Sequence, residues 1–304
     1  MKQVKGIVRS LLPTRIETVI TRMVRAMEIA VYVHYFRTRN RLSSQRLQDS
    51  PNKPIVSLTS FPARLGLVHL TIESIFRQSE PPGAVYLWLY DGEISRSDLP
   101  LAIRRLERRG LRIEFVPENL RGAKKLIYAA RALPERTLVT ADDDLLYPRN
   151  WLQRLTAASL VTPETVICHR GHTIKRRANG SFERYWECMR HEEGGAKPSF
   201  ALLPTGGAGA LYPPGTINHQ VSDTALMLRL CPTADDVWFK AMTLLNGVKS
   251  RRVAEHNFMP IVIPDSQKQA LIHGNKHAND EQIKATFSYF DLTEHFPMER
   301  ASVE

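Results

Sequence analysis

The chain of 304 residues has few cysteines, and they form no recognisable pattern. Cys168, Cys188 and Cys231 are scattered, without a CxxC pair or any other zinc-ligand spacing. An odd and scattered set argues against a disulfide framework and against a structural zinc site. We therefore expect a protein of a reducing, cytoplasmic environment.

Long apolar runs and familiar nucleotide motifs are also missing. No run approaches the roughly 20 apolar residues that a membrane-spanning helix requires, and we find no signal-peptide core with a small-residue cleavage site. The lack of GxGxxG after the first predicted strand and of GxxxxGK[ST] argues against a dinucleotide-binding fold and a P-loop. Hydrophobic residues still make up 43% of the chain, which suits one large folded domain or two small ones.

Acidic residues are scarce at the N-terminal end. Residues 1–50 hold ten basic and three acidic residues, so +7 of the formal net charge of +11 lies there. Excess positive charge favours nucleic acid, anionic lipid or phosphorylated ligands as partners. Because most of the excess lies in one segment, a basic nucleic-acid-binding protein is the weaker, non-enzyme alternative, and we expect no nucleic-acid partner.

The basic segment has helical periodicity. Apolar residues recur at spacings of three and four on both sides of Pro13, with Lys and Arg between them. We predict a basic amphipathic helical extension and linker over residues 1–50. The polar stretch of residues 40–53 is the expected connection to the main domain. Residues 1–36 are expected to lie on an anionic membrane surface. The alternative is an arm that packs on its own domain or on a second subunit.

From residue 51 to 290 the pattern predicts one α/β domain. Strands and helices alternate at a spacing typical of a mostly parallel sheet with helical crossovers. The predicted strands cover residues 55–60, 84–90, 111–116, 137–141 and 166–169, and the predicted helices 68–78, 99–109 and 123–132. A polar hairpin over residues 175–185, a glycine-rich turn over 204–215 and a helix capped by Thr233 follow; residues 291–304 are a tail.

Three consecutive carboxylates, Asp142 to Asp144, end the fourth strand. Open α/β sheets bind ligands at the carboxyl ends of their strands. Neighbouring carboxylates repel one another, and Mg²⁺ or Mn²⁺ would neutralise them and bridge to a diphosphate. Asp142 and Asp144 share one side of an extended strand and are the predicted metal ligands, whereas Asp143 points the other way. The alternative is a simple turn in which one Asp caps the helix near Arg149.

A second acidic pair, Asp235-Asp236, begins the helix after Pro232. Acidic residues in a first turn complement the helix dipole, which is the simple interpretation. The functional interpretation makes one of them a general base beside the metal site.

Three weaker signals accompany the acidic motifs. Gly206, Gly207 and Gly209 would let the backbone approach a ligand closely. Lys124 and Lys125 begin a helix and meet a phosphate, meet a ribose-side carboxylate, or are solvated. His273 or His277 is a candidate third metal ligand.

Together these residues resemble the inverting glycosyltransferases of the GT-A fold, close to family 2 and its bacterial polysaccharide or glycolipid members. The opening Ser57-Leu-Thr-Ser-Phe-Pro-Ala-Arg64, Asp142-Asp-Asp144, Gly206–Gly209 and Asp235-Asp236 follow the order of that family's motifs over residues 54–245. The resemblance implies a GT-A fold with a nucleotide-binding half, residues 51–150, and an acceptor half, residues 151–290.

The same resemblance implies roles for single residues. Thr59, Ser60 and Arg64 would lie near the base and ribose of a nucleotide-sugar, most often UDP-linked, with Lys125 and Asp142 also on the donor side. The diphosphate would meet Mn²⁺ or Mg²⁺ held by Asp142 and Asp144. Asp236 would deprotonate the acceptor hydroxyl, and Gly207 and Asp235 would lie on the acceptor side. The acceptor would be a glycan or a lipid-linked glycan at the inner face of the cell membrane.

The sequence departs from the family in two places. The acidic pair is Asp-Asp rather than Glu-Asp, and no Gln/Arg-x-x-Arg-Trp motif follows it, which argues for adding one sugar rather than extruding a polymer. A sugar-phosphate nucleotidyltransferase is the enzyme alternative, since it also uses paired Asp and Mg²⁺ at a sheet edge. Such an enzyme usually carries a glycine-rich basic loop after its first strand, where this chain has only Gly66.

Overall fold

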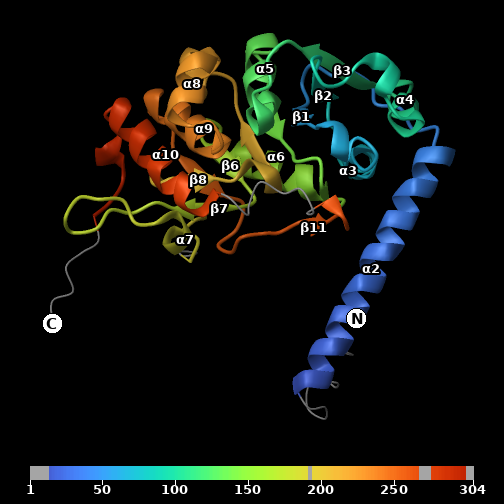
Figure 1. Cartoon of the computed structure of the whole chain (residues 1–304), viewed down its shortest axis with the longest axis horizontal. Coiled ribbons are helices and arrows are strands. Elements are labelled where there is room, and N and C mark those ends of the chain that lie inside the picture. The colour runs from blue at the N-terminus through green and yellow to red at the C-terminus, as the bar shows by residue number, and fades with distance from the viewer. Residues whose placement is uncertain (1–13, 191–193, 267–274, 299–304) are drawn as a thin grey trace.

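A computed structural model describes residues 14–190, 194–266 and 275–298. The body of the molecule has three layers, a central sheet with helices on both faces, and one long helix projects from it (Figure 1). The mostly parallel α/β sheet predicted from the sequence is confirmed.

The central sheet has seven strands in the order β10-β6-β9-β4-β1-β2-β3. β3, β2, β1 and β4 pair in parallel, β9 runs antiparallel between β4 and β6, and β10 is parallel to β6. The reversed β9 therefore joins two parallel blocks; β4 is the central strand, and β1, β2 and β3 continue the sheet to one edge. Their bounds are β1 Ile55–Thr59, β2 Ala84–Tyr90, β3 Leu111–Val116, β4 Leu138–Thr140, β6 Val166–Cys168, β9 Ala210–Tyr212 and β10 Ser250–Arg252.

Two apolar clusters lie on opposite faces of the sheet because successive strand residues point to opposite sides. In β2, for example, Val85 and Leu87 join one cluster and Tyr86 and Trp88 the other. α3 (Val68–Phe76), α4 (Leu101–Glu107) and α6 (Trp151–Val161) cover the first face. α5 (Lys124–Ala132), α8 (Thr224–Leu230), α9 (Asp235–Leu245) and α10 (Asn275–Tyr289) cover the second.

Short elements complete the described fold. Two small antiparallel ladders pair β5 with β11 and β7 with β8. The bounds are β5 Leu145–Leu146, β7 Gly171–Thr173, α7 Tyr185–Cys188, β8 Leu202–Pro204 and β11 Ile261–Val262. Single 3-10 turns cover Pro62–Arg64, Arg96–Asp98, Arg121–Ala123, Gly206–Ala208, His219–Ser222 and Thr293–His295. Arg176 and Phe182 form an antiparallel bridge, as the predicted hairpin requires.

The N-terminal extension is a helix, α2, from Thr14 to Leu42, and only its C-terminal end is part of the domain. Phe36 is buried against Leu70 of α3, and Asn40 Nδ2 donates to Glu73 Oε1 at 3.2 Å. Glu73 is fully buried and also pairs with Arg39 of α2 and with Arg109. This end of the helix therefore packs on its own domain, which was the alternative to an arm that lies on a membrane.

The other half of α2 leaves the body of the molecule (Figure 1). Val19, Met23, Met27, Val31 and Tyr35 follow one another at four-residue spacing and are all exposed. Side chains at this spacing form a single stripe along a helix, and Phe36 lies on the opposite side. α2 therefore has two apolar faces, one docked at its C-terminal end and one exposed along its length. No helix within the described residues is long and apolar enough to cross a membrane.

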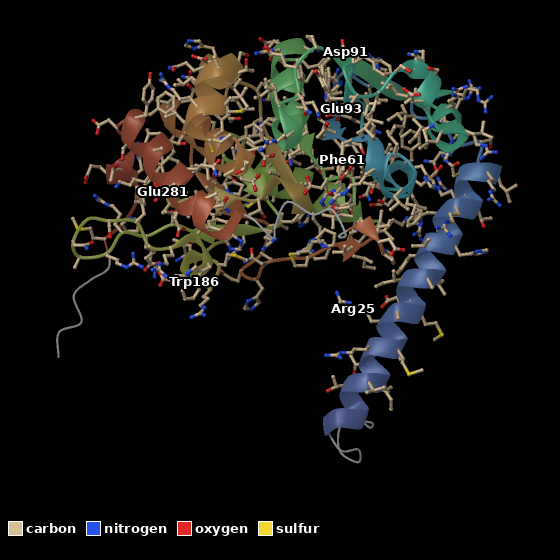
Figure 2. The ribbon with its side chains drawn as sticks, in the orientation of Figure 1. Arg25, Phe61, Asp91, Glu93, Trp186 and Glu281 are labelled. Atoms are coloured by element: carbon tan, nitrogen blue, oxygen red, sulfur yellow. The ribbon has the colours of Figure 1, made fainter. Side chains whose placement is uncertain are left out.

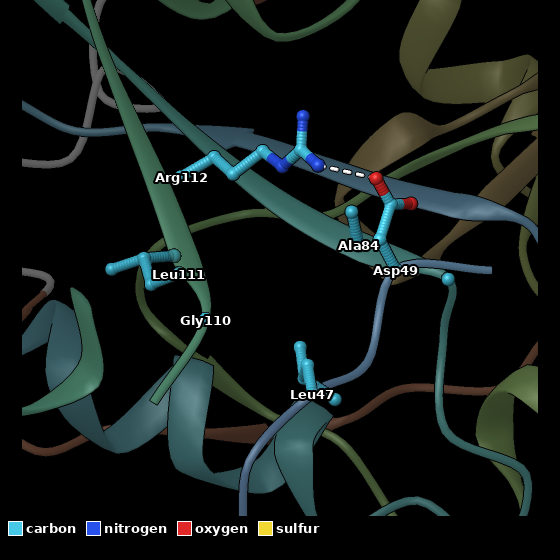
Figure 3. Close-up of a pocket in the computed structure, with 7 residues that line it drawn as sticks. Leu47, Asp49, Ala84, Gly110, Leu111 and Arg112 are labelled. Carbon is cyan, nitrogen blue, oxygen red and sulfur yellow. Dashed lines mark hydrogen bonds and ion pairs between the residues drawn. The ribbon is translucent and has the colours of Figure 1, made fainter. Parts of the chain in front are cut away.

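The predicted linker is packed against the sheet. The Leu47 amide donates to the Arg109 carbonyl at 2.9 Å, and Asp49 pairs with Arg112. Leu47, Asp49, Gly110 and Arg112 line a small pocket of about 160 Å³ (Figure 3). The pocket lies at the start of β3, which is the end of the parallel strands opposite to the acidic motifs. Residues 43–53 thus hold α2 to the domain edge.

Two expectations about helix caps are wrong. Thr233 does not cap α9; Ala234 occupies the N-cap position, and the Thr233 hydroxyl accepts from Gln282 of α10 at 2.8 Å. None of the three aspartates caps α6, whose N-cap is Asn150 without a side-chain hydrogen bond. The alternative in which one of these aspartates caps α6 is therefore wrong. The division at residue 150 stays a prediction, and strands from both halves lie in one sheet.

Candidate active site

The acidic motifs meet at the carboxyl ends of the parallel strands, at one end of the central sheet. Asp142 follows β4, and the antiparallel register of β4 and β9 places Thr140 opposite Ala210. The glycine turn that precedes β9 must therefore lie beside the aspartates that follow β4. Thr140 Oγ1 donates to the Gly206 carbonyl at 3.1 Å, and Gly206 N donates to Asp236 Oδ1 at 2.8 Å. Gly206 thus joins the two predicted motifs.

Lys125 is a second link between the two acidic motifs. Its ammonium lies 2.8 Å from Asp142 Oδ1 and 3.1 Å from Asp235 Oδ2. The Lys125 side chain is buried, and burial by itself lowers the pKa of an ammonium. The charges of Asp142, Asp235 and Asp236 outweigh that effect and hold the pKa of Lys125 well above its usual value. Lys125 is therefore a permanent cation between the two motifs.

The absence of side chains in the glycine turn is a steric requirement. A Cβ on Gly207 would lie 2.1 Å from Asp142 Oδ2. A Cβ on Gly206 would lie 3.1 Å from Asp236 Oδ1 and 3.5 Å from Lys125 Cε. Tyr147 fastens the turn to the aspartates, since its hydroxyl accepts from Asp142 N at 2.8 Å and donates to the Gly207 carbonyl at 2.6 Å.

Asp236 is a carboxyl with a raised pKa. Burial and the neighbouring charge of Asp235 raise it to about 7, although Lys125 and the Gly206 amide act in the opposite direction. A carboxyl with a pKa near neutrality exchanges protons readily at neutral pH, which is the property required of a general base.

The other two aspartates face Arg64. Asp143 is buried and accepts from Ser60 Oγ and from Arg64, each at 2.6 Å. The second Arg64 nitrogen lies 3.1 Å from Asp144 Oδ2. Burial raises the pKa of Asp143 despite Arg64, and burial with the charge of Asp142 raises that of Asp144 to about 6. Asp143 thus holds Ser60 and Arg64 in place, a role beyond the turn expected from sequence.

The donor-side prediction for Thr59, Ser60 and Arg64 remains untested, but their positions are informative. Thr59 is the last residue of β1, and Ser60 and Arg64 follow it at the same end of the strand. Thr59 Oγ1 donates to the Trp88 carbonyl at 2.8 Å, so this hydroxyl is engaged in the sheet. The Arg64 guanidinium also lies 5.3 Å from the Phe61 ring centre.

The sequence pattern did not single out Asn119, Glu93 or Asp91, which lie at this end of the strands. Lys124 Nζ donates to Asn119 Oδ1 at 3.1 Å, and Asn119 Nδ2 donates to Glu93 Oε1 at 2.9 Å. Glu93 follows β2, as does Asp91, and both are labelled in Figure 2. Polar residues directly after the predicted strands 84–90 and 111–116 were the signal that could have found them.

The two candidate metal ligands, Asp142 and Asp144, differ in how far their side chains are exposed to solvent. The Asp142 side chain is 39% exposed, whereas that of Asp144 is 10% exposed and lies against Arg64. Within residues 14–190, 194–266 and 275–298, no group of three or more His, Cys, Asp or Glu side chains is suited to hold a metal ion. His273 and the side chain of His277 lie outside the described residues.

Comparison with known proteins gives structural likeness only. No family model matches the chain, and no curated protein matches it. It is similar to the mannosyltransferase PcManGT of Pyrobaculum calidifontis in complex with GDP-Man and Mn²⁺, with a TM-score of 0.46 and 15% identity over 91% of this chain and 79% of that one.

The chain is also similar to residues 1–349 of S. aureus TarS. The TM-score is 0.44 and the identity 14%, over 67% of this chain and 59% of that one; the UDP complex of the same fragment gives 0.43 and 13%. Likeness at these values does not assign an activity. The function must be argued from the site itself.

Proposed function

We propose that the chain is a metal-dependent, inverting glycosyltransferase of the GT-A fold, similar to family 2. It moves one sugar from a nucleotide-sugar, UDP-linked in the simplest case, to a hydroxyl of a glycan or glycolipid. The observation that carries the proposal is the pairing of an accessible carboxylate, Asp142, with a carboxyl of raised pKa, Asp236, on either side of the Gly206-Gly207 turn. Two carboxylates with different surroundings can divide metal binding and proton transfer.

The carboxylates of Asp142 and Asp144 suit a divalent cation that takes most of its ligands from phosphate oxygens and water. Mg²⁺ and Mn²⁺ prefer oxygen, and Mg²⁺ in particular is commonly bound by one or two carboxylates together with phosphates and water. Asp142 offers an exposed carboxylate, and the missing Cβ of Gly207 leaves room for its Oδ2. Asp142 would hold the cation with Asp144 as the second ligand. When bound, the cation would neutralise charge on the leaving diphosphate.

Asp236 is the proposed base. Its carboxylate takes the proton of the acceptor hydroxyl while the hydroxyl oxygen forms a bond to the anomeric carbon. The bond from that carbon to the diphosphate oxygen breaks, and the electron pair leaves with the nucleoside diphosphate. Attack from the face opposite to the leaving group inverts the configuration. The Gly206 amide holds Asp236 in place for this transfer.

Lys125 and Arg64 are the cations of this chain at the donor side. Lys125 lies beside Asp142, where the diphosphate would approach, and Arg64 is fixed by Asp143 and Asp144. Ser60 and Thr59 line the same edge, where base and ribose would lie. Asp235 and Gly207 lie toward the proposed acceptor side.

The exposed stripe of α2 is the proposed membrane contact. It presents apolar side chains at every fourth position in a segment with excess basic charge. Amphipathic basic helices of this kind lie in the headgroup region of anionic membranes. The contact would place the site near a lipid-linked acceptor at the inner face of the cell membrane, in surface polysaccharide synthesis. Figure 2 shows Trp186 and Arg25 on the same lower side of the molecule.

A donor screen tests the proposal. UDP-, GDP-, CMP- and dTDP-sugars are added with Mn²⁺, and both thermal stabilisation and release of the nucleoside diphosphate are followed. We expect one nucleotide class to stabilise the fold by mass action and to release its sugar. Release of pyrophosphate from a nucleoside triphosphate and a sugar phosphate would instead identify a nucleotidyltransferase.

A further inference from the structure

Lys125 occupies an unusual position for a lysine. Its side chain is 5% exposed, and its ammonium lies between the carboxylates of Asp142 and Asp235. The neighbouring Lys124, also buried, instead donates to the neutral Asn119 side chain. Lys125 alone of this pair neutralises the carboxylate proposed to bind the metal.

The glycine turn and α5 fix Lys125 in that position. The lysine stem lies close to the glycine turn, since a Cβ on Gly206 would be in van der Waals contact with Lys125 Cε at 3.5 Å. The Lys125 carbonyl accepts from Ser57 Oγ of β1, so the start of α5 is tied to the sheet. The ammonium therefore stays beside Asp142 as a fixed charge.

A fixed ammonium opposes a second cation on the same carboxylate. A divalent ion bound to Asp142 would lie within a few ångströms of Lys125 Nζ, because both contact one carboxyl group. Repulsion between like charges at that distance is stronger than in bulk water, because the Lys125 side chain is buried. A donor diphosphate reverses the balance, because it brings negative charge and the oxygen ligands that the ion needs.

We infer that Lys125 is a built-in counter-ion that prevents Asp142 from binding a divalent cation alone, so that the cation enters only with the donor diphosphate. This inference rests on the proposed function and adds a positioning residue to it. The metal and the donor are then coupled ligands, each raising the affinity of the site for the other.

The experiment measures Mn²⁺ binding without nucleotide, by the loss of the free-ion electron paramagnetic resonance signal at one neutral pH. Wild type should bind Mn²⁺ weakly. Lys125→Met should bind it about tenfold more tightly or better, since the repulsion is gone. Lys124→Met is the matched control, because it removes a neighbouring buried lysine that donates to Asn119 and forms no ion pair with Asp142, and it should stay closer to the wild-type affinity.

Two further variants separate charge from structure. Lys125→Arg keeps the positive charge and should keep weak Mn²⁺ binding. Lys125→Gln is neutral but still donates a hydrogen bond to Asp142, so it preserves the packing if Lys125→Met melts early, and it should bind Mn²⁺ tightly. Adding Asp142→Asn to either neutral variant should abolish the gained affinity.

Unchanged or weaker Mn²⁺ binding in a folded neutral variant would overturn the inference. The proposed function fails separately, if the wild-type chain releases no sugar from any nucleotide-sugar in the donor screen. Mn²⁺ binding without nucleotide needs no substrate, so each result is interpretable without the other.

Discussion

Asp142 and Asp235, distant in the sequence, share the single ammonium group of Lys125, at 2.8 and 3.1 Å. Together with the contact of Asp236 to the Gly206 amide, this makes the two acidic motifs one electrostatic unit. Substitutions in any part of the unit should therefore alter the others.

The first prediction concerns the glycine turn. Gly207→Ala places a methyl group against Asp142 Oδ2, and the carboxylate must rotate away. We expect metal-dependent nucleotide affinity to fall about tenfold, because a displaced carboxylate loses its ligand geometry. The melting temperature should change little, since the side-chain end can move. Gly66→Ala, with nothing within 4 Å of the new methyl group, is the control in the same titration. Equal affinity in both variants would remove Gly207 from the site.

The second prediction concerns pH. Asp236 must be deprotonated to accept a proton, and its pKa is raised to about 7. We expect kcat/KM for sugar transfer to rise about tenfold per pH unit below that value and to level off above it. A flat profile between pH 5 and 8, measured where the fold is intact, would argue against this base.

The raised pKa of Asp236 also has a consequence for stability. A carboxyl whose folded-state pKa lies above its unfolded value favours folding at low pH and loses that contribution as pH rises through the folded pKa. Asp236→Asn should therefore gain stability relative to wild type above pH 7 and not at pH 4, as urea denaturation at both values will show.

The third prediction concerns the anchor of α2. Glu73→Ala leaves Arg109 buried without its carboxylate, and we expect a loss of about 3–5 kcal/mol in the free energy of unfolding. Glu107→Gln breaks the exposed pair with Arg96 and should cost less than about 1 kcal/mol. Denaturant titration of both variants measures the difference. Similar small losses in both would mean that the buried cluster does not hold the helix.

The fourth prediction concerns the exposed stripe of α2. Met23 and Met27 are 67% and 66% exposed, and replacing both with Glu should weaken binding to phosphatidylglycerol vesicles about tenfold or more. Leu160→Glu changes a side chain of α6 that is 84% exposed and should not affect binding. If the double variant still sediments with the vesicles, the stripe serves another partner, such as a second copy of the chain.

The strands that support the site could be predicted well from the sequence, because strand positions follow from local residue patterns. The strands at 84–90 and 111–116 have the predicted bounds, and Asp142 lies at the end of its strand as expected. Periodicity and turn residues report such features directly.

Contacts made by distant elements were not predictable. The Thr233 cap failed because Gln282 of α10 takes its hydroxyl and amide. The bridge from Lys125 to Asp235 depends on how α5 and α9 face each other, which no local pattern records. The anchoring of α2 depends on Glu73, a buried carboxylate within an apolar helix.

The central claim is that Asp236 transfers the proton and does not bind the donor. Asp236→Asn keeps the shape of the side chain and removes the base. With the nucleotide-sugar found in the donor screen, the account predicts a fall in kcat of about 10²–10⁴-fold, and nucleotide affinity with Mn²⁺ within about threefold of wild type. Normal turnover, or loss of nucleotide binding in the folded variant, would contradict it.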